Sequence, residues 1–324
     1  MRLARIGVLT ALYVWCGALG GAQALAQEFP KGPVRLIVPF TAGGATDVIA
    51  RLMSQKLTEL WSQPVVVDYR PGAGTLIGVD AAAKSTPDGQ TIGIVVSSFT
   101  INPALRRTMP YDTLKDLSGV TMLTRFAIAI VANPSLPFND IKGLVDYAKR
   151  NPGRLSFASP GTGGTAHLTG ELLKAVAGID MVHVPYKGGA PGLVDVMAGR
   201  VQLMSEPLFS TMTYVRSGKL KVIAVSTERR SPGYEEFPAI AETYPKFDVS
   251  AYIGFVVPSA TPRPIIRKIR DDSVKALHAP EVRPRILDLG NELIGSTPGE
   301  FDAFIADDMK KWVKVISDAG IPRE

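Results

Sequence analysis

The sequence predicts an α/β fold built as two lobes. Short runs rich in β-branched residues alternate with runs that have helical spacing, and the strand-like runs are continuously apolar. Continuous apolar runs are typical of strands covered on both faces, as in a parallel sheet between layers of helices. A glycine pair between a strand-like run and a helical run occurs twice, at Gly43-Gly44 and at Gly163-Gly164. We expect one such unit in each lobe.

The elements follow in alternating order along the 324 residues. We expect strands at 34–40, 65–69, 91–97, 127–132, 155–159, 181–186, 201–205, 221–226 and 252–257. Apolar residues at helical spacing predict helices at 48–61, 78–83, 141–150, 167–177, 191–199, 264–278, 284–289 and 298–319.

The chain is expected to cross between the lobes twice, near 123–125 and near 227–229. Lobe 1 would comprise residues 27–124 plus 229–324, and lobe 2 would comprise residues 125–228. Two crossings form a two-strand hinge, which allows the lobes to close around a ligand.

Residues 1–26 have the pattern of a cleaved signal peptide. Arg2 and Arg5 precede an apolar run at 6–19, and Ala24-Leu25-Ala26 offers a cleavage site before Gln27. The single cysteine, Cys16, would leave with this segment, so the mature chain needs no disulfide. We expect export to the periplasm.

Composition argues against several classes of function. The net charge of +6 is spread out, and the densest basic stretch, 263–270, has the spacing of a solvated helix face without interleaved aromatic residues. We therefore expect no nucleic-acid partner. After the expected signal peptide, no apolar run is long enough to cross a membrane, and the sequence contains no motif of a metal site.

The two glycine-pair loops predict an anion site. A helix N-terminus carries free N–H groups and partial positive charge, and glycine lets an anion approach closely. The simpler interpretation is a strand-to-helix turn that needs glycine for its backbone angles. The expected ligand-binding residues of the two loops are Phe40, Thr41, Ala42, Gly43, Gly44 and Asp47, and Ser159, Thr162, Gly163, Gly164, Thr165 and His167.

Three further residues are candidates because of their position at strand ends. Ser98 and Phe99 follow the strand expected at 91–97, and Glu206 follows the strand expected at 201–205. Ligands of open α/β sheets gather at such ends. Glu206 would select a polar or cationic part of the ligand, or would bond nearby backbone.

Two enzyme interpretations compete with the binding site. Gly161-x-Gly163-x-x-Ala166 fits a dinucleotide fingerprint, but no acidic residue follows the next expected strand, so we expect no cofactor. Ser159 and His167 could be a nucleophile and base of a periplasmic hydrolase. His183, inside an apolar strand, is expected to be a core histidine.

Ordered motifs along the whole chain resemble the periplasmic receptors of tripartite tricarboxylate transporters, the Bug or TctC-like family. The motifs are 34–40 with Gly43-Gly44 and Asp47, 66–68 with 70–74, Pro87-Asp88-Gly89, Asn102-Pro103, 110–112, 183–188 with Pro191, and 218–220.

The resemblance implies a two-lobed periplasmic-binding-protein fold of type II, the Venus flytrap. It implies no catalysis, a carboxylate held by backbone amides of the facing loops 40–47 and 159–167, and membrane transporter subunits as partners. We expect a monomer. A sensor that signals to a membrane kinase would use the same closure. Tyr69, Thr75, Arg106 and Glu206 depart from the family pattern, so the resemblance does not identify the acid.

Overall fold

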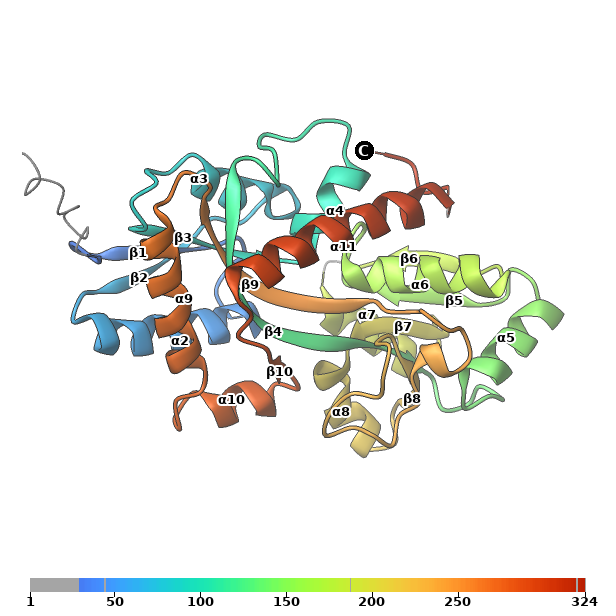
Figure 1. Ribbon diagram of the computed structural model, residues 1–324. Coiled ribbons are helices and arrows are strands. Elements are labelled where there is room, and N and C mark those ends of the chain that lie inside the picture. The colour runs from blue at the N-terminus through green and yellow to red at the C-terminus, as the bar shows by residue number, and fades with distance from the viewer. Residues whose placement is uncertain (1–28, 44, 187, 319, 324) are drawn as a thin grey trace, which may run out of the picture.

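The computed structural model describes residues 29–43, 45–186, 188–318 and 320–323. The expected signal peptide and Gly44 lie outside these ranges. The strands join edge to edge in the order β2-β1-β3-β9-β4-β7-β5-β6, with β8 and β10 also paired to β4 (Figure 1). Their bounds are β1 Val34–Val38, β2 Val65–Tyr69, β3 Thr91–Val96, β4 Leu117–Ala132, β5 Ser156–Ser159, β6 Val182–Pro185, β7 Leu203–Pro207, β8 Lys221–Val225, β9 Ser250–Pro258 and β10 Glu292–Leu293.

Helices cover both faces of the curled sheet in each half of the molecule. The helices are α2 Ala45–Trp61, α3 Leu76–Ala83, α4 Ser98–Leu105, α5 Ile141–Arg150, α6 Thr165–Ala177, α7 Gly189–Met197, α8 Leu208–Arg216, α9 Arg263–Leu277, α10 Arg283–Asp288 and α11 Pro298–Asp318, with short 3-10 turns η1 at Ala73–Thr75 and η2 at Ile240–Glu242. In one half, α2, α9 and α10 share a buried cluster on one face, and α3 and α11 share another cluster on the opposite face. In the other half, α5 and α6 cover one face and α7 and α8 the other. The predicted α/β fold is therefore confirmed.

The strand directions differ in part from the expectation of a parallel sheet. β1 pairs in parallel with β2 and β3, and β5 pairs in parallel with β6 and β7. β4 and β9 instead run antiparallel to each other and to their neighbours. They are antiparallel because they run between the two halves in opposite directions, side by side at the centre of Figure 1.

β4 is the strand that both halves share. Its first part pairs with β9 as far as Ala127, and its last part pairs with β7 and β8. The sequence predicted only 127–132 of this strand. Residues 117–126 were missed because buried Ser118, Thr121 and Thr124 interrupt the apolar run.

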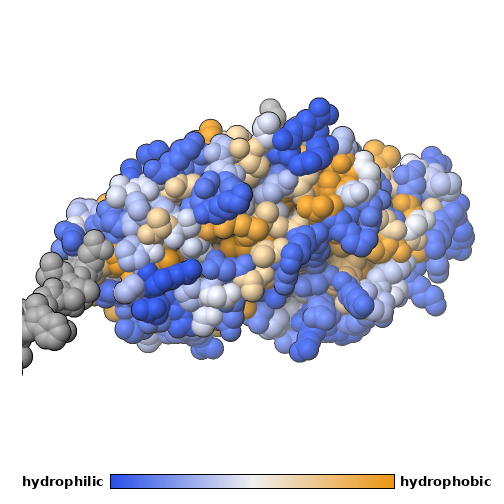
Figure 2. All heavy atoms as spheres, turned by 45° about the horizontal axis from the view of Figure 1, so that its top comes forward, coloured by the Kyte–Doolittle hydropathy of each residue, from blue (hydrophilic) through white to orange (hydrophobic). Residues whose placement is uncertain are grey.

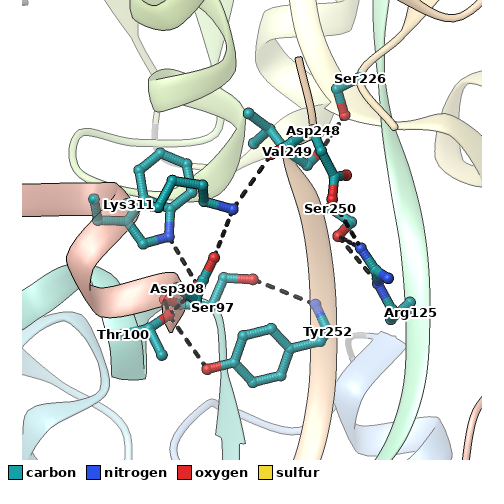
Figure 3. A network of polar contacts seen from close by, with 11 residues as sticks. Ser97, Thr100, Arg125, Ser226, Asp248, Val249, Ser250, Tyr252, Asp308 and Lys311 are labelled. Atoms are coloured by element: carbon teal, nitrogen blue, oxygen red, sulfur yellow. Dashed lines mark hydrogen bonds and ion pairs between the residues drawn. The ribbon is translucent and has the colours of Figure 1, made fainter. Parts of the chain in front are cut away.

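A polar network ties the two central strands to α11 (Figure 3). The Arg125 Nε on β4 donates to the Ser250 Oγ on β9 at 3.1 Å, and Arg125 also pairs with Asp248 at 3.3 Å. On the other side of β9, Asp308 of α11 accepts a hydrogen bond from the Thr100 hydroxyl at 2.6 Å. Lys311 pairs with Asp308 and donates to the Asp248 carbonyl. These contacts connect α4, α11 and the strands that run between the halves.

Residues 231–249 pack mainly against the half that contains β8. The Val225 N–H donates to the Pro238 carbonyl, and the Val249 N–H donates to the Ser226 carbonyl. Ala239 and Phe247 are buried in clusters of that half. The expected boundaries at 125 and 228 stay predictions. This packing favours a proposal that the return crossing falls near Val249 and Ser250.

Candidate functional site

A cavity of about 470 Å³ is lined by residues from both halves of the molecule. Five helices begin at or beside its lining residues. These residues are Thr46 in the first turn of α2, Thr75 as N-cap of α3, Ser98 at the start of α4, Gly164 and Thr165 at the start of α6, and Pro207 as N-cap of α8. Each helix start presents N–H donors and partial positive charge. The cavity is therefore suited to an anion.

The side chains of the cavity wall reinforce this electrostatic character. Among the described lining residues, Arg106 is the one with a charged side chain, and none has a carboxylate. Hydroxyl groups of Thr75, Ser98 and Thr162 add donors, while Phe126 and Ile128 supply apolar surface. A ligand with a carboxylate and a short carbon chain matches this wall.

The first glycine-pair loop is braced from within. The Gly43 N–H donates to the Asp47 Oδ2 at 2.8 Å, and Asp47 also accepts from the Tyr69 hydroxyl at 2.5 Å and from Arg51 at 3.0 Å. Burial of Asp47 opposes its ionisation, but these hydrogen bonds outweigh burial and hold its pKa below the usual range. Asp47 is thus an anion that orders the loop.

The second glycine-pair loop is braced by a histidine in the same way. The Gly163 N–H donates to the His167 Nδ1 at 3.1 Å, so this nitrogen must be unprotonated. The His167 ring stacks on His183 with centroids 3.9 Å apart. Burial lowers the pKa of both histidines to about 4. Both rings are therefore neutral at pH 7.

The structure does not pair Ser159 with His167. The fully buried Ser159 Oγ lies 2.7 Å from the His183 Nε2 and also donates to the Gly161 carbonyl. The His167 Nδ1 is occupied by Gly163. Ser159 is therefore not exposed, and its histidine neighbour is His183 rather than the His167 of the hydrolase interpretation. His183 lies in β6 against Phe157 and is half-buried.

The predicted site residues divide into two groups. Those that line the cavity are Phe40, Ser98, Thr162, Gly163, Gly164 and Thr165. Those that lie outside its lining are Thr41, Ala42, Gly43, Asp47, Phe99, Ser159, His167 and Glu206. Phe99 is 1% exposed and stacks on Tyr111 in the core. Ligand contact by any of these residues stays a prediction, and Gly44 lies outside the described ranges.

Glu206 is buried between α7 and α8. Its Oε1 accepts from the Ser210 hydroxyl at 2.9 Å, and its carboxyl lies directly against Gly189. The Oε2 has no hydrogen-bond partner within the described ranges. Burial raises the pKa of Glu206 to about 7. Its role in ligand selection stays a prediction.

Sequence reasoning missed part of the first-lobe wall. Thr75, Asn102, Arg106 and Tyr252 line the cavity but were not proposed as ligand contacts. Arg106 follows α4, which was not predicted as a helix because it is short and contains Pro103. The departures of Thr75 and Arg106 from the family pattern were the signal that could have identified them.

The sequence pattern of the tripartite tricarboxylate transporter family receptor, TctC, matches residues 49–321. The chain belongs to this family of solute-binding receptors. It is similar to the protein BugT of Bordetella pertussis, at 32% identity over 99% of each chain.

Solved structures of receptors share the fold. A structure of Rpa4515 from R. palustris with adipate matches with a TM-score of 0.80 and 31% identity, covering 91% of this chain and 99% of that one. MatC from Rhodopseudomonas palustris with bound malate matches with a TM-score of 0.76 and 27% identity, covering 89% and 100%. The two-lobed periplasmic-binding-protein fold is therefore confirmed.

Within the described ranges, no helix is both long and apolar enough to cross a membrane. On the face in Figure 2, apolar patches are interrupted by hydrophilic side chains.

Proposed function

We propose that the protein captures a small mono- or dicarboxylate in the cavity between its lobes. The observation that carries the proposal is the convergence of five helix starts on a cavity whose described lining has no carboxylate. Removing a carboxylate from water is tolerated only when several donors replace its hydration. The relatives with bound adipate and malate support the same ligand class.

In this proposal the amides at the start of α6 hold one carboxylate. Gly164, Thr165 and Ala166 line the cavity, and Gly164 is the N-cap of the helix. On the facing wall, Ser98 stands at the start of α4. Hinge movement along β4 and β9 would bring these two helix starts together around the ligand.

The cellular role follows from the family. Receptors of this family are periplasmic and serve tripartite transporters. We propose that residues 1–26 direct export and are removed, and that the closed form delivers the ligand to the membrane subunits of such a transporter.

The test is a charge placed at the start of α6. A Cβ on Gly164 meets nothing within 4 Å, and its φ of −84° suits any residue. Asp is a favourable N-cap, so Gly164→Asp should fold and melt at or above the wild-type temperature. Its carboxylate should repel the ligand and abolish the rise in melting temperature that excess adipate or malate gives to the wild type.

Gly164→Asn is the matched control, because it has nearly the same shape and is also a good N-cap, but carries no charge. It should retain more of the ligand-induced shift than Gly164→Asp. Equal shifts in wild type and Gly164→Asp would contradict the assignment of the cavity.

A further inference from the structure

We propose that residues 320–323, the segment after α11, form a strap that holds the end of α4 in place at the cavity wall, with Arg323 as its positioning residue. Arg323 is not among the residues that line the cavity. It acts on the ligand through α4, which contributes Ser98, Asn102 and Leu105 to the lining. The effect on binding rests on the proposed function, because it assumes that the ligand lies in this cavity.

The sequence after α11 turns the chain back toward α4. Gly320 has φ +62°, a left-handed conformation that glycine adopts readily. The Gly320 N–H donates to the Ser317 carbonyl at 3.1 Å, and the Ile321 N–H donates to the Ile316 carbonyl at 3.0 Å. These two hydrogen bonds are the pattern of a Schellman motif, which ends a helix and reverses the chain. In Figure 1 the segment runs back from the end of α11 toward α4.

Arg323 caps the carboxyl end of α4. Its Nη2 donates to the Arg106 carbonyl at 2.8 Å and to the Pro103 carbonyl at 3.2 Å. Carbonyls in the last turn of a helix have no partner inside the helix, and their partial negative charge attracts a cation. The Arg323 carbonyl in turn accepts from the Arg107 Nε at 3.4 Å. Arg323 thus supplies donors that this end of α4 needs.

α4 depends on contacts of this kind because it is a weak helix by itself. It has only eight residues, and an isolated helix of that length is marginal in water. Pro103 lies inside it and has no N–H for the hydrogen bond to the preceding turn. Near the start of α4, Asp308 of α11 accepts from the Thr100 hydroxyl at 2.6 Å (Figure 3). α11 and the strap therefore hold α4 at two positions.

The end of α4 is the part of the wall that meets the other half of the molecule. Leu105 lies against Gly163 of the second glycine-pair loop. Ile321 of the strap packs against the buried cluster that contains both Leu105 and Phe157 of β5. When the strap is released, the end of α4 occupies this place only part of the time. The apparent Kd of the ligand then rises by the reciprocal of that fraction.

The first measurement follows α4 without any ligand. Hydrogen exchange of the full chain is read by mass spectrometry in a peptide that covers residues 98–107. In Arg323→Gln, we expect the amides at the end of α4 to exchange about threefold or more faster than in wild type. Among them is the Arg106 N–H, which donates to the Asn102 carbonyl at 2.9 Å. Peptides from α2, in the same lobe, should exchange at the wild-type rate.

The second measurement is affinity, by calorimetric titration with a series of mono- and dicarboxylates that includes adipate and malate. Arg323→Gln should bind the acids that wild type binds about threefold or more weakly. Arg323→Lys should recover part of this loss, because its ammonium group can still donate to one of the two carbonyls. The melting temperature of the free protein should stay within about 2 °C of wild type, because the contact is exposed.

Arg285→Gln is the matched control. Arg285 is exposed on α10, lies outside the cavity lining, and gives the same change in net charge. Its replacement should leave both the exchange of α4 and the affinity unchanged. Equal losses of affinity in Arg285→Gln and Arg323→Gln would overturn the inference, because they would reflect long-range attraction of the anion only.

The two measurements also separate this inference from the proposed function. Unchanged exchange at the end of α4 in Arg323→Gln refutes the strap, whatever the ligand. Faster exchange with unchanged affinity refutes its effect on the cavity. A wild-type protein that binds no acid of the series contradicts the proposed function, whereas the exchange measurement still decides whether the strap holds α4.

Discussion

Asp47 and His167 perform the same structural task with different chemistry. Each lies four residues after the first glycine of a pair and accepts that glycine's N–H, at 2.8 Å for Gly43 and 3.1 Å for Gly163. The amides of Gly43 and Gly163 are therefore used inside the loops. This arrangement leaves the helix starts beside them to meet the ligand, and it makes each loop depend on one acceptor.

At the same scale, we expect replacement of Thr75 by glycine to have opposite effects on stability and on ligand binding. Thr75→Gly removes the strain at φ +81° but also the hydroxyl that contacts Ser98. We expect the free energy of unfolding to stay level or rise by up to about 1 kcal/mol, since relief of strain offsets the added chain entropy of glycine. The affinity for the carboxylate that proves to bind, such as adipate or malate, should fall several-fold because Thr75 lines the cavity. Chemical denaturation and calorimetry measure the two quantities.

Lys246→Gly is the control for this experiment. Lys246 has φ +72°, is exposed, and lies away from the cavity lining. Lys246→Gly should relieve a similar backbone strain without any change in the affinity for the carboxylate ligand. A Thr75→Gly protein that binds as well as wild type would show that the hydroxyl has no role.

At the scale of elements, the end of α4 touches the second glycine loop. A Cβ on Gly163 would lie 2.5 Å from the Leu105 Cδ2, and Gly163 has φ +77°. Leu105 comes from the expected first lobe and Gly163 from the expected second lobe. The missing side chain at Gly163 therefore allows these two elements to approach.

Gly163→Ala should separate the elements as well as strain the loop. We expect adipate affinity to fall about tenfold or more, because the added methyl group opposes the approach of α4 to the loop. Gly178→Ala is the matched control, since Gly178 ends α6 with φ +61° and has open space around its Cβ. Both variants should lose roughly 1 kcal/mol of stability from the left-handed backbone. Equal affinities in both variants would contradict the role of the contact.

At the scale of the whole molecule, buried titratable groups make stability depend on pH. Burial lowers the pKa of His167 and His183 from 6.5 to about 4, so the unfolded chain binds more protons between these values. Their contribution to stability is complete above pH 6.5 and is lost as the pH falls toward 4. Glu206 acts in the opposite sense, because burial raises its pKa to about 7 and its contribution is lost as the pH rises from 4.5 through 7.

His167→Asn should reduce the acid sensitivity. Asp47 shows that a short side chain four residues after the first glycine can accept a hydrogen bond from that glycine's N–H. An asparagine at position 167 can therefore replace the histidine as acceptor without titrating. Between pH 7 and pH 5, we expect the variant to lose about 1–2 kcal/mol less unfolding free energy than wild type. Denaturation curves at both pH values give the difference. Identical losses would show that His167 does not carry the effect.

The sequence alone determined the α/β class and most of the elements. Helix α5 and strand β2 were predicted with their observed ends, because their apolar spacing and stop signals are local properties. The pair Gly163-Gly164 likewise located the loop at the start of α6, because a strand-to-helix turn with glycines is a local pattern. Local pattern was less informative where burial depends on distant partners. Polar residues interrupt the apolar run in the first part of β4, yet this part is almost entirely buried in the fold.

Tertiary structure decided which residues share the cavity. Phe99 looked like a ligand contact because it follows a strand, yet its ring packs in the core beside Tyr111. Arg106 and Thr75, 31 residues apart in the sequence, line one cavity because α4 packs against η1. The spacing of residues in the sequence determines which chemical groups each loop carries. The direction of a side chain and the charge of the cavity wall are decided only when separate elements pack together.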